Sequence, residues 1–165
     1  MYFTPRKQIR LNSYDYSSAG MYFITVCSKD RQKLFGQKFM QNDTAKVMLS
    51  EMGKCVEGVI CEIPEHYSNV SVDKYCIMPD HIHMIICLNA DTGGRIQTVC
   101  PGISAPTEKM PSVSQITGSM KRRASYLTHV SLWQKSFYEH IIRNYDDYLE
   151  TIKYIEENPA KEMLT

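Results

Sequence analysis

The centre of the chain reads NVSVDKYCIMPDHIHMIICL over residues 69–88. Two runs rich in apolar residues flank Pro79-Asp80, a dipeptide typical of tight turns, so residues 69–78 and 81–88 are predicted to form an antiparallel hairpin. Side chains alternate along a strand, which puts these residues of the second strand on one face: Ile82, Met84, Ile86 and Leu88. The opposite face carries His81, His83, Ile85 and Cys87, so the two histidines are expected side by side at its end.

Two adjacent neutral imidazoles are good ligands for a divalent metal ion. A metal at the end of a strand suggests a site that handles phosphate or catalyses hydrolysis. The alternative is that His81 and His83 are only polar residues that meet water where the strand begins. The His-x-His pattern by itself does not decide between the two.

Further elements are predicted on both sides of this hairpin. Residues 21–27 are β-branched and aromatic, which favours a buried strand. A helix is expected from about Asp43 to Ile60, with Pro64 closing that region. Its apolar face would carry Met48, Met52, Cys55, Val56 and Val59.

The second half of the chain begins with a loop at about 89–111, predicted to be mobile because it is rich in Gly, Pro and Thr. Ser112 is a suitable N-cap for a helix. The buried side of that helix would carry Val113, Ile116, Met120 and Leu127. A strand is predicted over 133–143, and a last helix runs from about Tyr145 to Asn158, where Pro159 is expected to stop it.

The predicted order of elements is β-α-β-β-α-β plus one C-terminal helix. This order predicts an α+β fold, a ferredoxin-like sandwich with helices packed on an antiparallel sheet. At 165 residues the chain is expected to form a single domain, 1–165.

The last helix carries an unusual pair of side chains. Its apolar stripe is predicted to comprise Tyr145, Tyr148, Leu149, Ile152 and Ile155. Tyr154 falls off this stripe, and Asn158 lies one turn further on the same side. A phenolate can act as a nucleophile, and an amide oxygen can complete a metal shell. Alternatively, Tyr154 is an exposed or interface tyrosine and Asn158 a C-terminal cap.

Composition restricts the partners and the compartment. Hydrophobic residues make up 43% and charged residues 22% of the chain, and the formal charge is only +1, so no overall basic field indicates a nucleic-acid partner. No apolar run is long enough to span a bilayer, and the first residues do not resemble a signal peptide. The expectation is a cytoplasmic protein without a membrane partner, at most associated with the bacterial nucleoid.

Several segments together resemble one family. Residues 78–84 resemble the HUH motif (His, bulky apolar residue, His) of the single-tyrosine transposases, and residues 154–159 resemble their tyrosine motif. Residues 132–144 resemble the segment before the tyrosine helix. Residues 10–16 through to 35–36 resemble the branch called REP-associated tyrosine transposases. The loop from Asp91 to Pro111 has no counterpart in this resemblance.

The resemblance implies a role for each site residue. His81 and His83 would hold Mg²⁺ or Mn²⁺ with Asn158 as third ligand, a position at which many relatives carry Gln. Tyr154, on the C-terminal helix, would attack single-stranded, hairpin-forming DNA and form a covalent 5′-phosphotyrosine intermediate before the strands are rejoined. The protein would act as a monomer or a homodimer.

DNA contacts are predicted from two groups of basic residues. Lys121, Arg122 and Arg123 lie on the helix that follows Ser112, and Arg6 and Arg10 lie near the N-terminus. A solvated helix face explains the first group equally well.

Two other functions remain open at this point. One is a hairpin-DNA-binding protein that has lost catalysis. The other is a metal-dependent phosphoesterase that uses water, for which His129-Val130-Ser131 would be a second motif. Tyr138, Tyr145 and Tyr148 are alternative nucleophiles.

Overall fold

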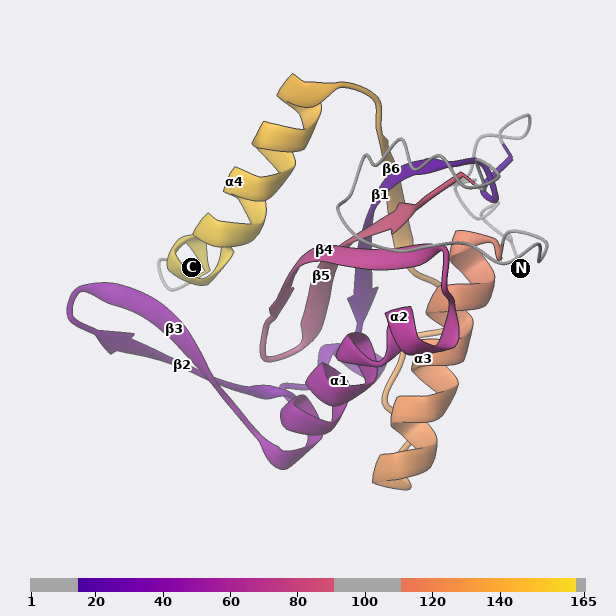
Figure 1. The fold of residues 1–165 in the computed structure, drawn as a ribbon. Helices are drawn as coiled ribbons and strands as arrows, with labels where there is room; N and C mark the ends of the chain where they lie inside the picture. The colour runs from indigo at the N-terminus through magenta and orange to yellow at the C-terminus, as the bar shows by residue number, and fades with distance from the viewer. Residues whose placement is uncertain (1–14, 91–110, 163–165) are drawn as a thin grey trace, which may run out of the picture.

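The computed structural model of the chain describes residues 15–90 and 111–162. Its centre is a four-stranded sheet of β1 (Gly20–Cys27), β4 (Val70–Ile77), β5 (His81–Leu88) and β6 (Tyr138–Ile142). The spatial order is β4-β5-β1-β6, and every neighbouring pair is antiparallel (Figure 1). With α1 (Glu51–Cys61) and α3 (Val113–Thr128), the element order β1-α1-β4-β5-α3-β6 confirms the predicted ferredoxin-like α+β fold.

The central hairpin is formed as predicted. The Met78 N–H donates to the His81 carbonyl at 2.8 Å and closes the turn through Pro79 and Asp80. All eight residues of β5 are buried, because both faces of this strand are covered. The register pairs Thr25 of β1 with His83 and Cys27 with His81, which fixes where the histidine side chains emerge.

The two faces of the sheet have different coverings. One face packs against α1 and α3 and forms the main core, to which β5 contributes Ile82, Met84, Ile86 and Leu88. The other face carries a small cluster of Phe23, Ile85 and Cys87 with Ile155 of α4 (Tyr145–Lys161). Figure 1 shows α4 alone on its side of the sheet, with α1, α2 (Ile63–His66) and α3 on the opposite side.

The predicted helix at 43–60 is wrong over residues 43–50. Residues 36–49 form a two-stranded ribbon, β2 (Gly36–Gln41) and β3 (Thr44–Leu49), with its turn at Asn42 and Asp43. Both turn residues have positive φ, at 49° and 57°, which asparagine and aspartate tolerate better than most residues and which hairpin turns of two residues require. Helix α1 starts only after Ser50, whose Oγ accepts from the Gly53 N–H at 3.1 Å. Met48 therefore lies on an exposed strand and not on the helix face.

Helix α3 begins as predicted. Ser112 and Gln115 form a capping box, with Ser112 N to Gln115 Oε1 at 2.8 Å and Gln115 N to Ser112 Oγ at 3.3 Å. Val113, Ile116 and Met120 are buried, but Leu127 is 44% exposed, so its predicted burial is wrong. The predicted strand at 133–143 is confirmed only for Tyr138–Ile142; Trp133 makes an isolated bridge to Ser28. The predicted loop at 89–111 falls almost entirely outside the described residues.

The predicted apolar stripe of helix α4 is wrong for Tyr145 and Leu149. Tyr145 is 71% exposed and Leu149 is also exposed, whereas Thr151, Ile155 and Asn158 are buried. Polar Thr151 is tolerated there because its hydroxyl donates to the Asp147 carbonyl at 2.8 Å.

Pro159 does not stop this helix. It continues to Lys161, and the Glu162 N–H donates to the Asn158 carbonyl at 3.1 Å. Proline lacks an N–H and its ring crowds the carbonyl four residues earlier, but the N–H groups after it can still donate, so the turn beyond it can form. The extra turn brings Glu162 to the histidine face of the sheet.

Candidate active site

The two histidines of β5 form the centre of the site. His81 and His83 are only 3% and 2% exposed, and their Nε2 atoms lie 3.0 Å apart. This distance brings together two ring nitrogens that come from alternate residues of one strand. The side-by-side placement predicted from the sequence is therefore confirmed.

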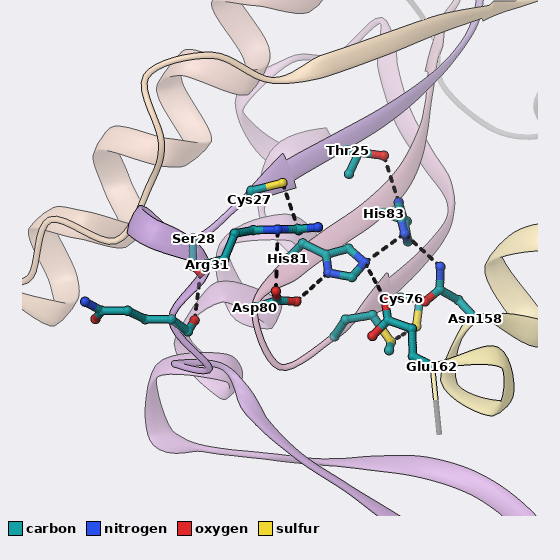
Figure 2. A network of polar contacts seen from close by, with 12 residues as sticks. Thr25, Cys27, Ser28, Arg31, Cys76, Asp80, His81, His83, Asn158 and Glu162 are labelled. Atoms are coloured by element: carbon teal, nitrogen blue, oxygen red, sulfur yellow. Dashed lines mark hydrogen bonds and ion pairs between the residues drawn. The ribbon is translucent and has the colours of Figure 1, made fainter. Parts of the chain in front are cut away.

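The Nδ1 atom of each histidine ring lies within hydrogen-bond distance of a side-chain oxygen (Figure 2). Asp80 Oδ1 lies 2.7 Å from His81 Nδ1, and Thr25 Oγ1 lies 2.8 Å from His83 Nδ1. A carboxylate can only accept, so His81 carries its hydrogen on Nδ1 and directs the Nε2 lone pair inward. Such outer partners are typical of histidines that bind metal, because they fix the tautomer and the ring orientation.

The environment of His83 keeps its ring neutral. Burial and the neighbouring His81 lower the pKa of His83 to about 3. A neutral imidazole has the free lone pair that a metal ligand needs. Together with the orientation of His81, this gives two buried nitrogen donors that face one point.

Asn158 adds an amide to the histidine pair. Its Nδ2 lies 2.9 Å from His83 Nε2, across 75 residues of sequence, and the side chain is only 4% exposed. The amide oxygen is buried and has no hydrogen-bond partner among the described residues. A buried oxygen without a partner is costly, and coordination to a cation would satisfy it once the two similar ends of the amide exchange places. The donor set of two imidazoles and an amide oxygen fits a divalent metal.

Tyr154 lies beside these residues. Its ring meets the His83 ring edge-on at a centroid distance of 5.2 Å and the Phe23 ring at 5.9 Å. The side chain remains 43% exposed, and its hydroxyl makes no hydrogen bond to the described part of the chain. Tyr154 and both histidines line one open cavity of about 910 Å³. The phenol thus faces solvent next to the side chains of His81, His83 and Asn158.

Three site residues escaped the sequence analysis. Thr25 and Asp80 orient the histidines, and Glu162 Oε1 lies 3.6 Å from His81 Nε2. Asp80 directly precedes His81, so its sequence position is a usable signal. Glu162 gave no signal because the helix was expected to end at Pro159.

The predicted DNA-binding residues lie elsewhere. Helix α3 packs on the far face of the sheet, where the Lys121 Nζ donates to the Gln134 carbonyl and Arg123 Nε lies 2.5 Å from Glu62 Oε2. Lys121 and Arg122 line a second cavity, separate from the one at Tyr154. Arg6 and Arg10 lie outside the described residues.

The histidine cavity has its own basic residues. Arg31, Lys153 and Lys161 line it, and Lys161 lies 5.8 Å above the centre of the Tyr154 ring. The sequence analysis did not single them out for DNA contact, because they come from separate segments that only the fold brings together.

The structure also locates the possible second phosphoesterase motif. His129, the first residue of the possible second phosphoesterase motif, caps the C-terminus of α3 and lines the second cavity with Ser131. In the part of the chain that the structure describes, no helix has the length and apolar character needed to cross a membrane.

Comparisons with known proteins identify the family of this chain. The sequence model of the family described as "Transposase IS200 like" matches residues 16–158. A Haemophilus influenzae protein named "Uncharacterized protein" is 34% identical over 163 residues, covering 93% of this chain and 88% of that one. A second protein of the same organism, named "Putative REP-associated tyrosine transposase", is 26% identical and covers 89% of this chain and 74% of its own.

A solved structure has the same fold. It is the structure of a REP-associated tyrosine transposase bound to a REP hairpin, with a TM-score of 0.63 and 20% sequence identity. The match covers 93% of this chain and 74% of the solved chain. The family model spans the histidine strand, Tyr154 and Asn158, and ends before Lys161 and Glu162. The chain therefore belongs to the family of IS200-like transposases, enzymes that act on DNA.

Proposed function

We propose that the protein cuts and rejoins single-stranded, hairpin-forming DNA, with Tyr154 as the nucleophile and a divalent metal held by His81, His83 and Asn158. The observation that carries this proposal is the meeting of a solvent-facing tyrosine with a buried donor set of three side chains. A core tyrosine or a simple surface histidine would not account for both features.

The proposed reaction transfers the phosphoryl group first to the tyrosine and then from the tyrosine to a DNA 3′-OH. The Tyr154 oxygen attacks phosphorus and loses its proton, while the bond from phosphorus to the 3′ oxygen breaks and that oxygen takes up a proton. A 5′-phosphotyrosine and a free 3′-OH result. Attack of a 3′-OH on the phosphotyrosine then forms the new strand and releases the phenol.

Each residue of the site has a proposed role in this reaction. His81 and His83, oriented by Asp80 and Thr25, would hold Mg²⁺ or Mn²⁺. The bound ion would polarise the scissile phosphate and offset the charge that grows in the transition state. The edge contacts of the Tyr154 ring with Phe23 and His83 would position its hydroxyl.

The cavity supports DNA as the substrate. Arg31, Lys153 and Lys161 line it beside Tyr154, and cationic side chains are the usual partners of backbone phosphates. The hairpin preference is proposed from the solved relative, which is bound to a REP hairpin. All four central residues meet within one chain, so the proposed reaction requires no side chain from a second copy.

The test incubates the protein with end-labelled hairpin oligonucleotides and Mn²⁺ and resolves the products on a denaturing gel. The proposal predicts a slowly migrating protein–DNA band for the wild type that Tyr154→Phe loses. Cleavage without such a band would instead favour a phosphoesterase that uses water. Tight binding without cleavage would favour the binding-only alternative.

A further inference from the structure

We propose that Glu162 is an additional metal ligand of this site, next to His81, His83 and Asn158. The inference rests on the proposed function, because it assigns a residue to the same metal. Glu162 follows the last turn of α4, four residues after Asn158 and eight after Tyr154. Nucleophile, amide and carboxylate would thus come from successive turns of one helix.

Distances between donor atoms support this assignment. With metal–ligand bonds of about 2.1 Å, neighbouring octahedral ligands lie roughly 3.0 Å apart and opposite ligands roughly 4.2 Å apart. The His81 Nε2 atom lies 3.0 Å from His83 Nε2 and 3.6 Å from Glu162 Oε1. The first separation equals that of neighbouring ligands, and the second lies between the two values, so a small adjustment of the Glu162 side chain would bring Oε1 to a ligand position.

The direction of the carboxylate distinguishes Glu162 from Asp80. Asp80 contacts His81 at Nδ1, whereas Glu162 approaches Nε2, the nitrogen that faces His83 and Asn158 (Figure 2). Asp80 therefore orients the ring from behind, and Glu162 lies on the side where the lone pairs point. The two carboxylates have different roles in one cluster.

The chemistry of the donor set also favours a carboxylate at this position. His81, His83 and Asn158 are all neutral ligands, which leave the charge of a divalent ion uncompensated. Mg²⁺ and Mn²⁺ prefer oxygen ligands and are usually bound with at least one carboxylate. Glu162 would supply that negative charge and a further oxygen.

A contact from the β2–β3 ribbon holds Glu162 in place. The ribbon reaches the C-terminal end of α4 (Figure 1), and the Lys38 Nζ donates to the Glu162 backbone carbonyl. The same Nζ lies 3.9 Å from Glu162 Oε2, so the lysine attracts one carboxylate oxygen while the other faces His81. Lys38 thus contacts both the backbone and the side chain of the residue that caps α4.

The test measures the affinity for Mn²⁺ by titration calorimetry of the full chain. We expect Glu162→Gln to raise the dissociation constant at least about 10-fold. Glu157→Gln is the matched control: this residue lies on the same helix, lines the same cavity and pairs with Lys161 at 2.9 Å. Because its carboxylate pairs with Lys153 and Lys161 and not with a histidine, its loss is expected to change the dissociation constant by less than about 2-fold. Lys38→Met keeps the Glu162 carboxylate but removes the lysine that contacts it. This variant is expected to raise the dissociation constant by an intermediate factor of about 3.

The outcomes separate this inference from the proposed function. Equal Mn²⁺ affinities for wild type and Glu162→Gln would overturn the role of Glu162 while leaving the three other ligands in place. Equal losses in Glu162→Gln and Glu157→Gln would also overturn it, because they would indicate a general charge effect. Absence of Mn²⁺ binding by the wild type would contradict both the inference and the metal-assisted function.

Discussion

The Nε2 atoms of His81 and His83 lie 3.0 Å apart, and a different oxygen, from Asp80 or Thr25, lies at the second nitrogen of each ring. Two lone pairs that point at each other repel in a buried site unless a proton or a cation lies between them. The low pKa of His83 disfavours a charged ring at this point, and the proposed occupant is a divalent cation. The account therefore depends on metal binding at this point.

Replacement of a central ligand tests this dependence. His81→Ala is expected to weaken Mn²⁺ binding at least about 100-fold, because it removes one of the donors and opens the shell to water. Titration calorimetry provides the measurement. His129→Ala, at the cap of α3 in the second cavity, serves as the control and should bind Mn²⁺ like the wild type. An unchanged affinity in His81→Ala would remove the histidine pair from the metal site.

The orienting role of Asp80 has its own prediction. Asp80→Ala frees the His81 ring to rotate and to change tautomer, so we expect Mn²⁺ affinity to fall roughly 10-fold to 100-fold with all ligands still present. Asp146→Ala, an exposed carboxylate in the first turn of α4, is a control of equal charge. If both variants bind Mn²⁺ equally well, Asp80 does not orient His81.

The shifted pKa of His83 predicts how stability depends on pH. In the metal-free protein the folded pKa is about 3, well below the value of about 6.5 in an unfolded chain. Between these values the unfolded state binds more protons, so stability is fully present above about pH 6.5 and is lost as the pH falls. This residue contributes a slope of at most about 1.4 kcal/mol per pH unit.

Urea unfolding in the presence of a chelator, between pH 7 and pH 4.5, measures this slope. His83→Gln should show a shallower loss of stability than the wild type over the same range. Parallel curves for the two proteins would mean that His83 titrates normally in the fold.

Substitution of two glycines of α1 tests how closely this helix packs against Phe35, the residue before β2. A Cβ at Gly53 would lie 2.0 Å from the Phe35 carbonyl oxygen, which already accepts the Ser50 N–H. Gly53→Ala is therefore expected to destabilise the protein by roughly 3 kcal/mol or more. A Cβ at Gly58 meets nothing within 4 Å, so Gly58→Ala should stabilise the helix by about 0.5–1 kcal/mol. Denaturant midpoints that shift in the same direction in both variants would contradict the close approach at Gly53.

The strand of the histidines could be predicted because its pattern is local. Alternation along residues 81–88 and the turn at Pro79-Asp80 determine the hairpin and the histidine face without reference to the rest of the chain. The ribbon at 36–49 was missed for the opposite reason. Met48 lies four residues before Met52 and so continues the helical spacing of α1 backwards, and only Asn42-Asp43 indicates the turn.

The site as a whole could not be derived from local patterns. His83 and Asn158 are separated by 75 residues, and only the packing of α4 on the sheet brings them within 2.9 Å. The resemblance to a family supplied that link, while Glu162 lay beyond the expected helix end. Lys38, which contacts Glu162 there, is 124 residues away in the sequence, so no local pattern could indicate this contact.

The most direct test of the central claim identifies the residue that carries DNA. The wild type is incubated with a labelled hairpin oligonucleotide and Mn²⁺, digested with protease and nuclease, and the modified peptide is sequenced by mass spectrometry. We predict a nucleotide on Tyr154, and loss of the adduct in Tyr154→Phe but not in Tyr138→Phe, whose phenol lines the same cavity. A nucleotide on Tyr138 or on any other residue, or an adduct that persists in Tyr154→Phe, would contradict the account.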